Sequence, residues 1–212
     1  MSSAGVARVV SCSVHGVSGM PVTVEADVQP GLPSFTVVGL TDRAIQEARE
    51  RVRSALKNAG YGFPQSRVTA NLAPAELPKE GTGFDLALAV AILDRGDRRF
   101  ALGGTALIGE LALDARLRPV CGVLPMARAL RAAGVRTLVV PAENAAEAAL
   151  ADGVAVLPAG SLQDVVAHLQ GTLSLAPARR ASGTAEAGGA EAVELSDIRG
   201  QEVAKRALEI AA

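Results

Sequence analysis

Aromatic side chains are scarce in this sequence, making up 2% of its 212 residues, and tryptophan is missing altogether. A protein that binds single-stranded nucleic acid by base stacking needs several exposed rings, so the composition disfavours that class. Cysteine and histidine are equally rare, with two of each: Cys12, Cys121, His15 and His168. A structural zinc site needs four ligands at close spacing, so we expect no metal site and ordinary structural roles for both histidines.

An excess of charge and a long apolar run are also missing. The chain has 21 Lys and Arg against 22 Asp and Glu, a formal net charge of -1, which excludes a basic coat over the whole surface. No uncharged apolar run approaches the roughly 18 residues that suggest a membrane span, and the N-terminus lacks the pattern of a secretory signal. We therefore expect a folded cytoplasmic protein without a membrane partner, its core supplied by the 49% of hydrophobic residues.

The spacing of apolar residues predicts an α+β fold, a two-layer α/β arrangement of helices on a sheet. Residues 22–28 alternate strictly between apolar and polar, as a half-buried strand does. Residues 84–93 are almost wholly apolar, which is typical of a buried central helix. The predicted strands are 7–14, 22–28, 34–38, 67–72, a hairpin of 107–111 with 116–120, 136–140 and 154–157, and the predicted helices are 41–60, 84–93, 123–133, 143–150 and 161–169.

The first predicted helix, capped by Thr41, carries a basic stripe. Arg49, Arg53 and Lys57 recur at i, i+4 and i+8 on one face. One interpretation is a solvated helix face, supported by the i, i+4 pair of Glu47 with Arg51. The other is a contact surface for DNA or for an adjacent subunit. The sequence leaves both open.

The C-terminal part changes in composition. Residues 175–192 are rich in Ala, Gly, Pro and Ser, as flexible linkers are. We therefore predict a first domain over residues 1–172, a linker over 173–193 and the start of a second domain over 194–212. The apolar face of one short helix in that last segment cannot be buried by the helix alone.

Three stretches resemble a known family. They are VVGLTDRAIQEARERVRSALKNAGY (37–61), RVTANLAPAELPKEGTGFDLALAVAIL (67–93) and SDIRGQEVAKRALEIAA (196–212). Together they closely resemble the Mg-chelatase-like AAA+ ATPases of the ComM/YifB family, over the whole chain except the linker. This resemblance implies an N-terminal domain with a Lon-protease-like, ribosomal-S5-like fold, followed by a AAA+ module. It further implies a homo-hexameric motor that uses ATP and Mg²⁺ to promote DNA branch migration during natural transformation.

The similarity to Lon allows a residue-by-residue test of proteolysis. The nucleophilic serine of Lon lies in a loop resembling residues 78–85, and its position falls on Gly83. The dyad lysine follows a hairpin, and its position falls on Leu124. Glycine has no nucleophile and leucine has no base, so the resemblance implies a domain without protease activity. Thr82 carries a hydroxyl one residue away, but a shift by one residue aims the side chain elsewhere.

Charged residues near this loop have ordinary explanations. Lys79 and Glu80 fit a solvated loop, and Lys79 is also a candidate contact for a neighbouring subunit or for DNA. Asp85 lies in the first turn of the predicted central helix, where a carboxylate interacts favourably with the helix dipole. A magnesium site made by Glu80 and Asp85 is a weak alternative.

The segment Asp197–Gln201 resembles the opening of a AAA+ domain, which would place Ile198, Gly200 and Gln201 near the adenine of ATP. The phosphate-binding loop G-x-x-x-x-G-K-[ST] does not occur in this sequence, so we expect this chain alone to take no cofactor and not to hydrolyse ATP. The chain would then be the Lon-like domain, the linker and the truncated first helix of the AAA+ module. The alternatives are a stand-alone DNA-binding or ring-assembly module and a motor subunit of a metal chelatase.

Overall fold

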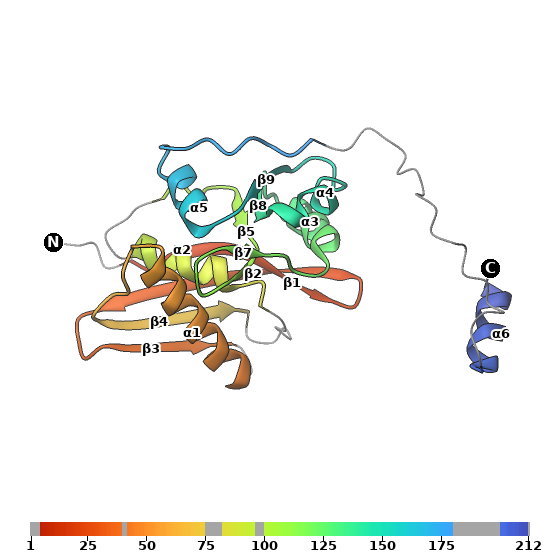
Figure 1. Ribbon diagram of the computed structural model, residues 1–212, viewed down its shortest axis with the longest axis horizontal. Coiled ribbons are helices and arrows are strands. Elements are labelled where there is room, and N and C mark those ends of the chain that lie inside the picture. The colour runs from red at the N-terminus through yellow and green to blue at the C-terminus, as the bar shows by residue number, and fades with distance from the viewer. Residues whose placement is uncertain (1–4, 40–41, 75–81, 96–99, 180–199, 212) are drawn as a thin grey trace. The chain divides into compact units, whose positions relative to one another are not determined.

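The computed structural model describes residues 5–39, 42–74, 82–95, 100–179 and 200–211 (Figure 1). Contacts within the chain divide it into two compact units, residues 1–180 and residues 181–212. Each unit is described by itself. In the described residues, no helix is both long enough and apolar enough to cross a membrane.

A seven-stranded mixed sheet forms the frame of the first unit, in the order β3-β4-β2-β1-β5-β8-β9. The half from β3 to β1 is mainly antiparallel, with only β3 and β4 parallel, and the half from β1 to β9 is parallel throughout. The bounds are β1 Ala7–His15, β2 Ser18–Gln29, β3 Ser34–Val38, β4 Arg67–Ala73, β5 Thr105–Leu107, β8 Thr137–Pro141 and β9 Ala155–Ala159.

Helices pack on both faces of the sheet through two hydrophobic clusters. The first cluster packs α1, α2 and α5 against one face of the sheet, and Figure 1 shows α1 and α2 lying across the strands β1 to β4. The second cluster packs α3 and α4 against the opposite face of β1, β5, β8 and β9. The predicted α+β class, with helices packed in a layer on a sheet, is confirmed. In the parallel half, α3 and α4 form a further layer on the opposite face of the sheet. The bounds are α1 Asp42–Asn58, α2 Asp85–Arg95, α3 Val123–Ala132, the 3-10 turn η1 Ala142–Asn144, α4 Ala145–Ala148 and α5 Leu162–Leu169.

Helix α1 buries the stripe that its sequence predicts, and Ala48, Val52 and Leu56 are all inaccessible to solvent or nearly so. The helix ends at Asn58, and Gly60 terminates it: its φ of +82° suits glycine, and its N–H donates to Lys57 O at 3.1 Å. The predicted cap Thr41 lies outside the described residues. Helix α2 is buried on all sides from Asp85 to Leu93, which confirms that it is the central helix.

The predicted hairpin of 107–111 with 116–120 is shorter in the structure. Thr105–Leu107 forms β5 and pairs with β1 and β8 in the main sheet instead. The hairpin itself consists of β6 (Glu110–Leu111) and β7 (Leu117–Arg118). The prediction was wrong because the mostly apolar run of residues 105–111 contributes one strand to each of two sheets. The pattern of apolar residues along the sequence does not show where one strand ends and the next begins.

The first unit extends past its predicted end at residue 172. The Leu175 N–H donates to Nδ1 of His168 at 3.2 Å, and the Ala178 N–H donates to Val156 O of β9 at 2.7 Å. Residues 173–179 therefore lie against the domain, and most of the predicted linker lies outside the described residues. In the second unit, α6 (Glu202–Ala211) leaves Val203 and other apolar side chains exposed.

Candidate functional site

Gly83, at the position of the Lon nucleophile, is buried at the N-terminus of α2. The Gly109 N–H donates to Gly83 O at 3.0 Å, which ties this turn to the segment before β6. A Cβ atom added at Gly83 would lie 3.9 Å from both Ile108 Cγ2 and Val120 Cγ1, which is ordinary contact. The backbone thus has room for a side chain at the point where the sequence supplies none.

The two positions of the Lon dyad face different cavities. Gly83 lines a cavity of about 470 Å³ together with Thr82, Glu110 and Cys12, whose buried thiol has its pKa raised to about 12 by desolvation. Leu124 lines a neighbouring cavity of about 700 Å³ between α3 and the β1–β2 turn, which shares Val14 and Cys121 with the first. Neither position offers a nucleophile or a base to the cavity that it lines.

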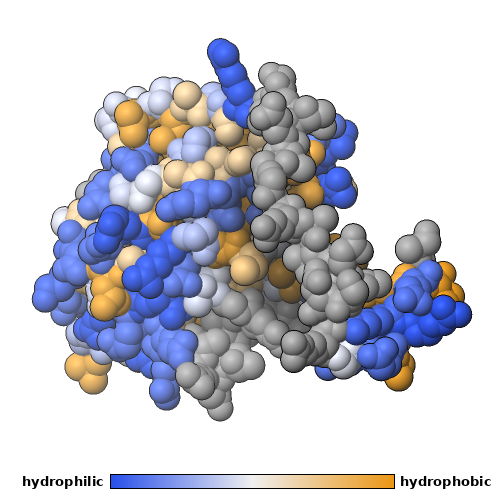
Figure 2. Space-filling view, turned by 45° about the vertical axis from the view of Figure 1, so that its right-hand side comes forward, coloured by the Kyte–Doolittle hydropathy of each residue, from blue (hydrophilic) through white to orange (hydrophobic). Residues whose placement is uncertain are grey.

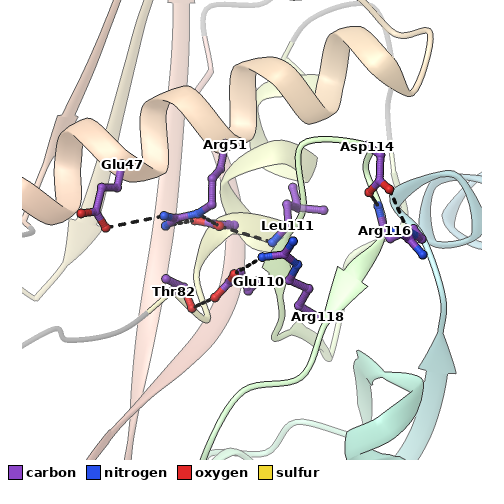
Figure 3. Close-up of polar contacts among 9 residues, drawn as sticks. Glu47, Arg51, Thr82, Glu110, Leu111, Asp114, Arg116 and Arg118 are labelled. Carbon is purple, nitrogen blue, oxygen red and sulfur yellow. Dashed lines mark hydrogen bonds and ion pairs between the residues drawn. The ribbon is translucent and has the colours of Figure 1, made fainter.

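The hydroxyl of Thr82, the remaining nucleophile candidate near Gly83, has a carboxylate partner (Figure 3). Thr82 Oγ1 donates to Glu110 Oε2, and Glu110 Oε1 lies 3.6 Å from Arg118 Nη1. The Thr82 hydroxyl is therefore hydrogen-bonded to a carboxylate that also faces the Arg118 guanidinium. An amine of lowered pKa, which a serine–lysine type of dyad needs, does not contact Thr82 in the described part of the chain.

A buried ion pair between Arg51 and Asp85 lies beside this hydroxyl. The Asp85 side chain is 1% exposed, and its Oδ2 accepts from Arg51 Nε at 2.6 Å and from the Leu111 N–H at 3.3 Å. Burial raises the Asp85 pKa to about 6, although the bond from Arg51 acts in the opposite direction. Glu47 lies 3.8 Å from the same guanidinium, and Figure 3 shows Glu47 and Arg51 on one side of α1.

This ion pair corrects two interpretations made from the sequence. Arg51 belongs to a half-buried network, whereas the pair with Glu47 suggested a solvated face. Asp85 is engaged by a guanidinium and a backbone N–H, which leaves its carboxylate little freedom to bind magnesium with Glu80, a residue outside the described ranges. Among the described residues, no three His, Cys, Asp or Glu side chains lie close enough together to hold a metal ion.

Two side chains from η1 and α4 hold the loop before α3. The Asn144 amide bonds both backbone groups of Val120, each at 2.9 Å. Glu147 Oε1 accepts from the Leu124 N–H at 2.9 Å and so satisfies a donor in the first turn of α3. The Leu124 position is thus fixed by polar contacts to its backbone, while its side chain packs against the second hydrophobic cluster.

The structure gives the basic residues of α1 aromatic partners. The guanidinium carbon of Arg49 lies 6.0 Å from the Phe35 ring centre, and that of Arg53 lies 5.5 Å from the Phe63 ring centre. Lys57 is exposed one turn further along the helix, and Lys79 lies outside the described residues. Sequence reasoning missed the rings, although Phe35 and Phe63 are two of only four phenylalanines in the chain.

The residues predicted to contact adenine belong to the second unit. Gly200 and Gln201 have φ angles of +71° and +59° and are exposed just before α6. Gln201 O accepts the first helical bond from the Lys205 N–H at 3.0 Å. Ile198 lies outside the described residues, and the adenine contact stays a prediction.

Comparison with known proteins assigns the family. Residues 24–144 match the family described as subunit ChlI of Mg-chelatase. The chain belongs to the ChlI family. That match runs from β2 to η1 and so includes the Gly83 turn, the buried ion pair and the basic face of α1.

Relatives of this ChlI-family chain are similar over almost its whole length. The competence protein ComM of Haemophilus influenzae is 42% identical over 210 residues, which are 97% of this chain and 41% of ComM. The uncharacterised protein YifB of Escherichia coli is 43% identical over 199 residues, 93% of this chain and 38% of YifB. This chain therefore spans about two fifths of the length of these relatives. The resemblance that the sequence motifs predicted is confirmed.

A more distant similarity supports the predicted fold. The Lon protease of Chloroflexus aurantiacus is 26% identical over 135 residues, which are 60% of this chain and 16% of that protease. The mixed sheet with its packed helices agrees with the expected Lon-like, S5-like fold.

Proposed function

We propose that this chain is the proteolytically inactive, Lon-like N-terminal domain of a Mg-chelatase-like AAA+ ATPase. The whole protein would be a cytoplasmic homo-hexamer that uses ATP and Mg²⁺ to drive branch migration on DNA in transformation and recombination. The chain itself would then support the motor by binding or assembly. The name of ComM, a competence protein that is 42% identical, supports the DNA role.

One observation carries the loss of proteolysis. Gly83 occupies the nucleophile position in a backbone that would accept a side chain, with 3.9 Å to its nearest neighbours. Leu124 at the lysine position lines another cavity. A domain that keeps the fold while lacking nucleophile and base is suited to a non-catalytic role.

The test is made on the complete protein that contains this domain. We expect its ATP hydrolysis to rise when branched DNA is added, and to disappear when the lysine of its phosphate-binding loop is replaced. We expect no peptide hydrolysis in the same preparation. Absence of ATP hydrolysis with every DNA, or peptide hydrolysis that Thr82→Ala abolishes, would contradict the proposal.

The description of the matched family supports a second candidate, a motor subunit of a metal chelatase. This candidate predicts ATP-dependent insertion of Mg²⁺ into a porphyrin when the other chelatase subunits are added, with no response to DNA. The same ATPase assay, run with branched DNA and with porphyrin, separates the two functions.

A third candidate is a stand-alone module that binds DNA or assembles a ring without hydrolysing ATP. It predicts that the dissociation constant of this chain for ATP is millimolar or higher. Calorimetry on the 212-residue chain measures this, and a low-micromolar affinity would contradict both this candidate and the expectation for the isolated domain.

A further inference from the structure

Helix α1 carries two kinds of arginine. Arg51 is 18% exposed and lies within ion-pair distance of Asp85 and Glu47. Three other cations, Arg49, Arg53 and Lys57, lie along a different line of the helix, and we call them the cationic face. Over the described residues, no carboxylate lies within ion-pair distance of this face.

Two aromatic rings support the cationic face. Phe35 of β3 and Phe63, which follows α1, lie with ring centres 5.2 Å apart and ring planes tilted by 47°, so the two rings are in contact. Arg49 lies over the first ring and Arg53 over the second. A guanidinium that stacks on a ring keeps its planar edge of N–H donors free and loses less rotational freedom when it binds an anion.

The Arg49 side chain is held close to the protein surface. Its Nε atom is buried and has no hydrogen-bond acceptor among the described residues. Buried donors in folded proteins are nearly always satisfied, and each exception needs an explanation. An anion bound at this face would meet the outer Nη groups of Arg49, because Nε itself is inaccessible to solvent.

The spacing of the three cations selects the chemistry of that anion. Residues four apart on a helix rise about 6 Å along its axis, so the cationic face is a row about 12 Å long. A phosphodiester backbone is a line of regularly repeated single negative charges, and each phosphate suits the fork of an arginine. We infer that the cationic face of α1 binds the phosphate backbone of DNA.

This inference rests on the proposed function, because it names where the domain contacts the DNA. It also agrees with a net charge of -1, since the contact needs one local row of cations and no basic coat. Such a contact carries no base readout, so we expect duplexes of different sequence to bind equally.

The experiment measures binding of a fluorescent DNA duplex to the 212-residue chain between 50 and 200 mM salt. Each phosphate contact contributes about −0.9 to the slope of log K against log salt, which corresponds to about 15-fold in affinity at 50 mM salt relative to 1 M salt. The double variant Arg49→Gln, Arg53→Gln should therefore bind at least tenfold more weakly and with a shallower slope. Lys57→Gln should weaken binding by a smaller factor, because its flexible amine is not stacked.

Three matched variants control for charge and fold. Arg8→Gln removes an exposed arginine that is paired with Glu25 at 3.0 Å and should leave binding unchanged. Glu50→Gln removes an exposed carboxylate from α1 beside the face and should tighten binding severalfold. Arg53→Lys keeps the charge but loses the planar fork, so it should bind more weakly than the wild type and more tightly than Arg53→Gln. Circular dichroism and the thermal midpoint confirm that each variant is folded.

Several results would overturn the inference. They are a wild-type chain that does not bind duplex DNA at 50 mM salt, a double variant that binds as the wild type does, and an acidic peptide of matched charge that binds as tightly as DNA. The complete protein separates this failure from failure of the proposed function. DNA-stimulated ATP hydrolysis that is unchanged in the double variant would contradict the site and leave the motor function standing.

Discussion

Arg51 Nε of α1 lies 2.6 Å from Asp85 Oδ2 at the buried start of α2, and this pair joins the two helices through residues that are 34 positions apart in sequence. Beside it lie the Thr82–Glu110 hydrogen bond and the cavity that Gly83 lines. The position that aligns with the Lon nucleophile is thus next to a structural ion pair.

Arg51→Met tests the importance of this pair for stability. The change leaves the Asp85 carboxylate buried without its cation, and removing one partner of a buried pair typically costs about 3–5 kcal/mol. We expect that loss at pH 8, and a smaller one at pH 5, where Asp85 can take up a proton. Urea unfolding at both pH values measures it, with Arg8→Met, in an exposed pair, expected to cost less than about 1 kcal/mol. Equal losses at the two pH values would contradict the role given to Asp85.

Asp85→Asn tests the pH dependence. The folded-state pKa of Asp85 is about 6, above its ordinary value of 3.8, so the folded chain binds more protons than the unfolded chain between these two values. The contribution of Asp85 to stability is therefore present below about pH 4 and is lost as the pH rises through 6. We expect the free energy of unfolding of the wild type, minus that of Asp85→Asn, to fall by roughly 3 kcal/mol over this window. A difference that stays flat or rises would show that the pKa of Asp85 is not raised.

Gly83→Ser tests whether a hydroxyl at the position of the Lon nucleophile is enough for proteolysis. The added Cβ would be 3.9 Å from its nearest neighbours, so we expect a thermal midpoint close to that of the wild type. We expect no peptide hydrolysis, because Leu124 lines a different cavity and no lysine takes the proton. A fluorogenic peptide assay measures it. Activity in this single variant would mean that another group, such as Glu110, acts as the base.

Gly19→Ala tests the packing of α3 on β2. A Cβ at Gly19 would collide with the Pro125 carbonyl oxygen and would lie 2.8 Å from Met126 Cα, both backbone atoms that cannot turn aside. We expect a loss of about 1–3 kcal/mol, as for other overpacked sites. Gly103→Ala is the matched control, since a Cβ there meets nothing within 4 Å. Equal stability of the two variants in urea unfolding would contradict the close approach.

The sequence predicted those elements whose apolar pattern is local and strong. The run of apolar residues around Leu88 predicted α2, and the alternation around Val24 predicted β2. The run from Leu107 to Leu111 was assigned to a single strand because its division between two sheets depends on pairing with β1 and β8, which lie far away along the chain.

The site was predicted less completely than the fold. The absence of a nucleophile and a base could be recognised at Gly83 and Leu124, because that comparison needs only an aligned motif. The partners of Arg51 and Arg53 could not, since Asp85 and Phe63 reach them through tertiary packing. For Arg51, a plausible i, i+4 partner in Glu47 already gave a local explanation and concealed the buried pair.

The bond from the Ala178 N–H to Val156 O has a mechanical consequence. Any tension applied to the chain beyond residue 179 acts first on this bond at the edge of the sheet and on the contact between Leu175 and His168, before it can unwind α5. A motor attached at that end would therefore transmit its force to β9, and through β8 and β5 to the strands that support the rest of the domain.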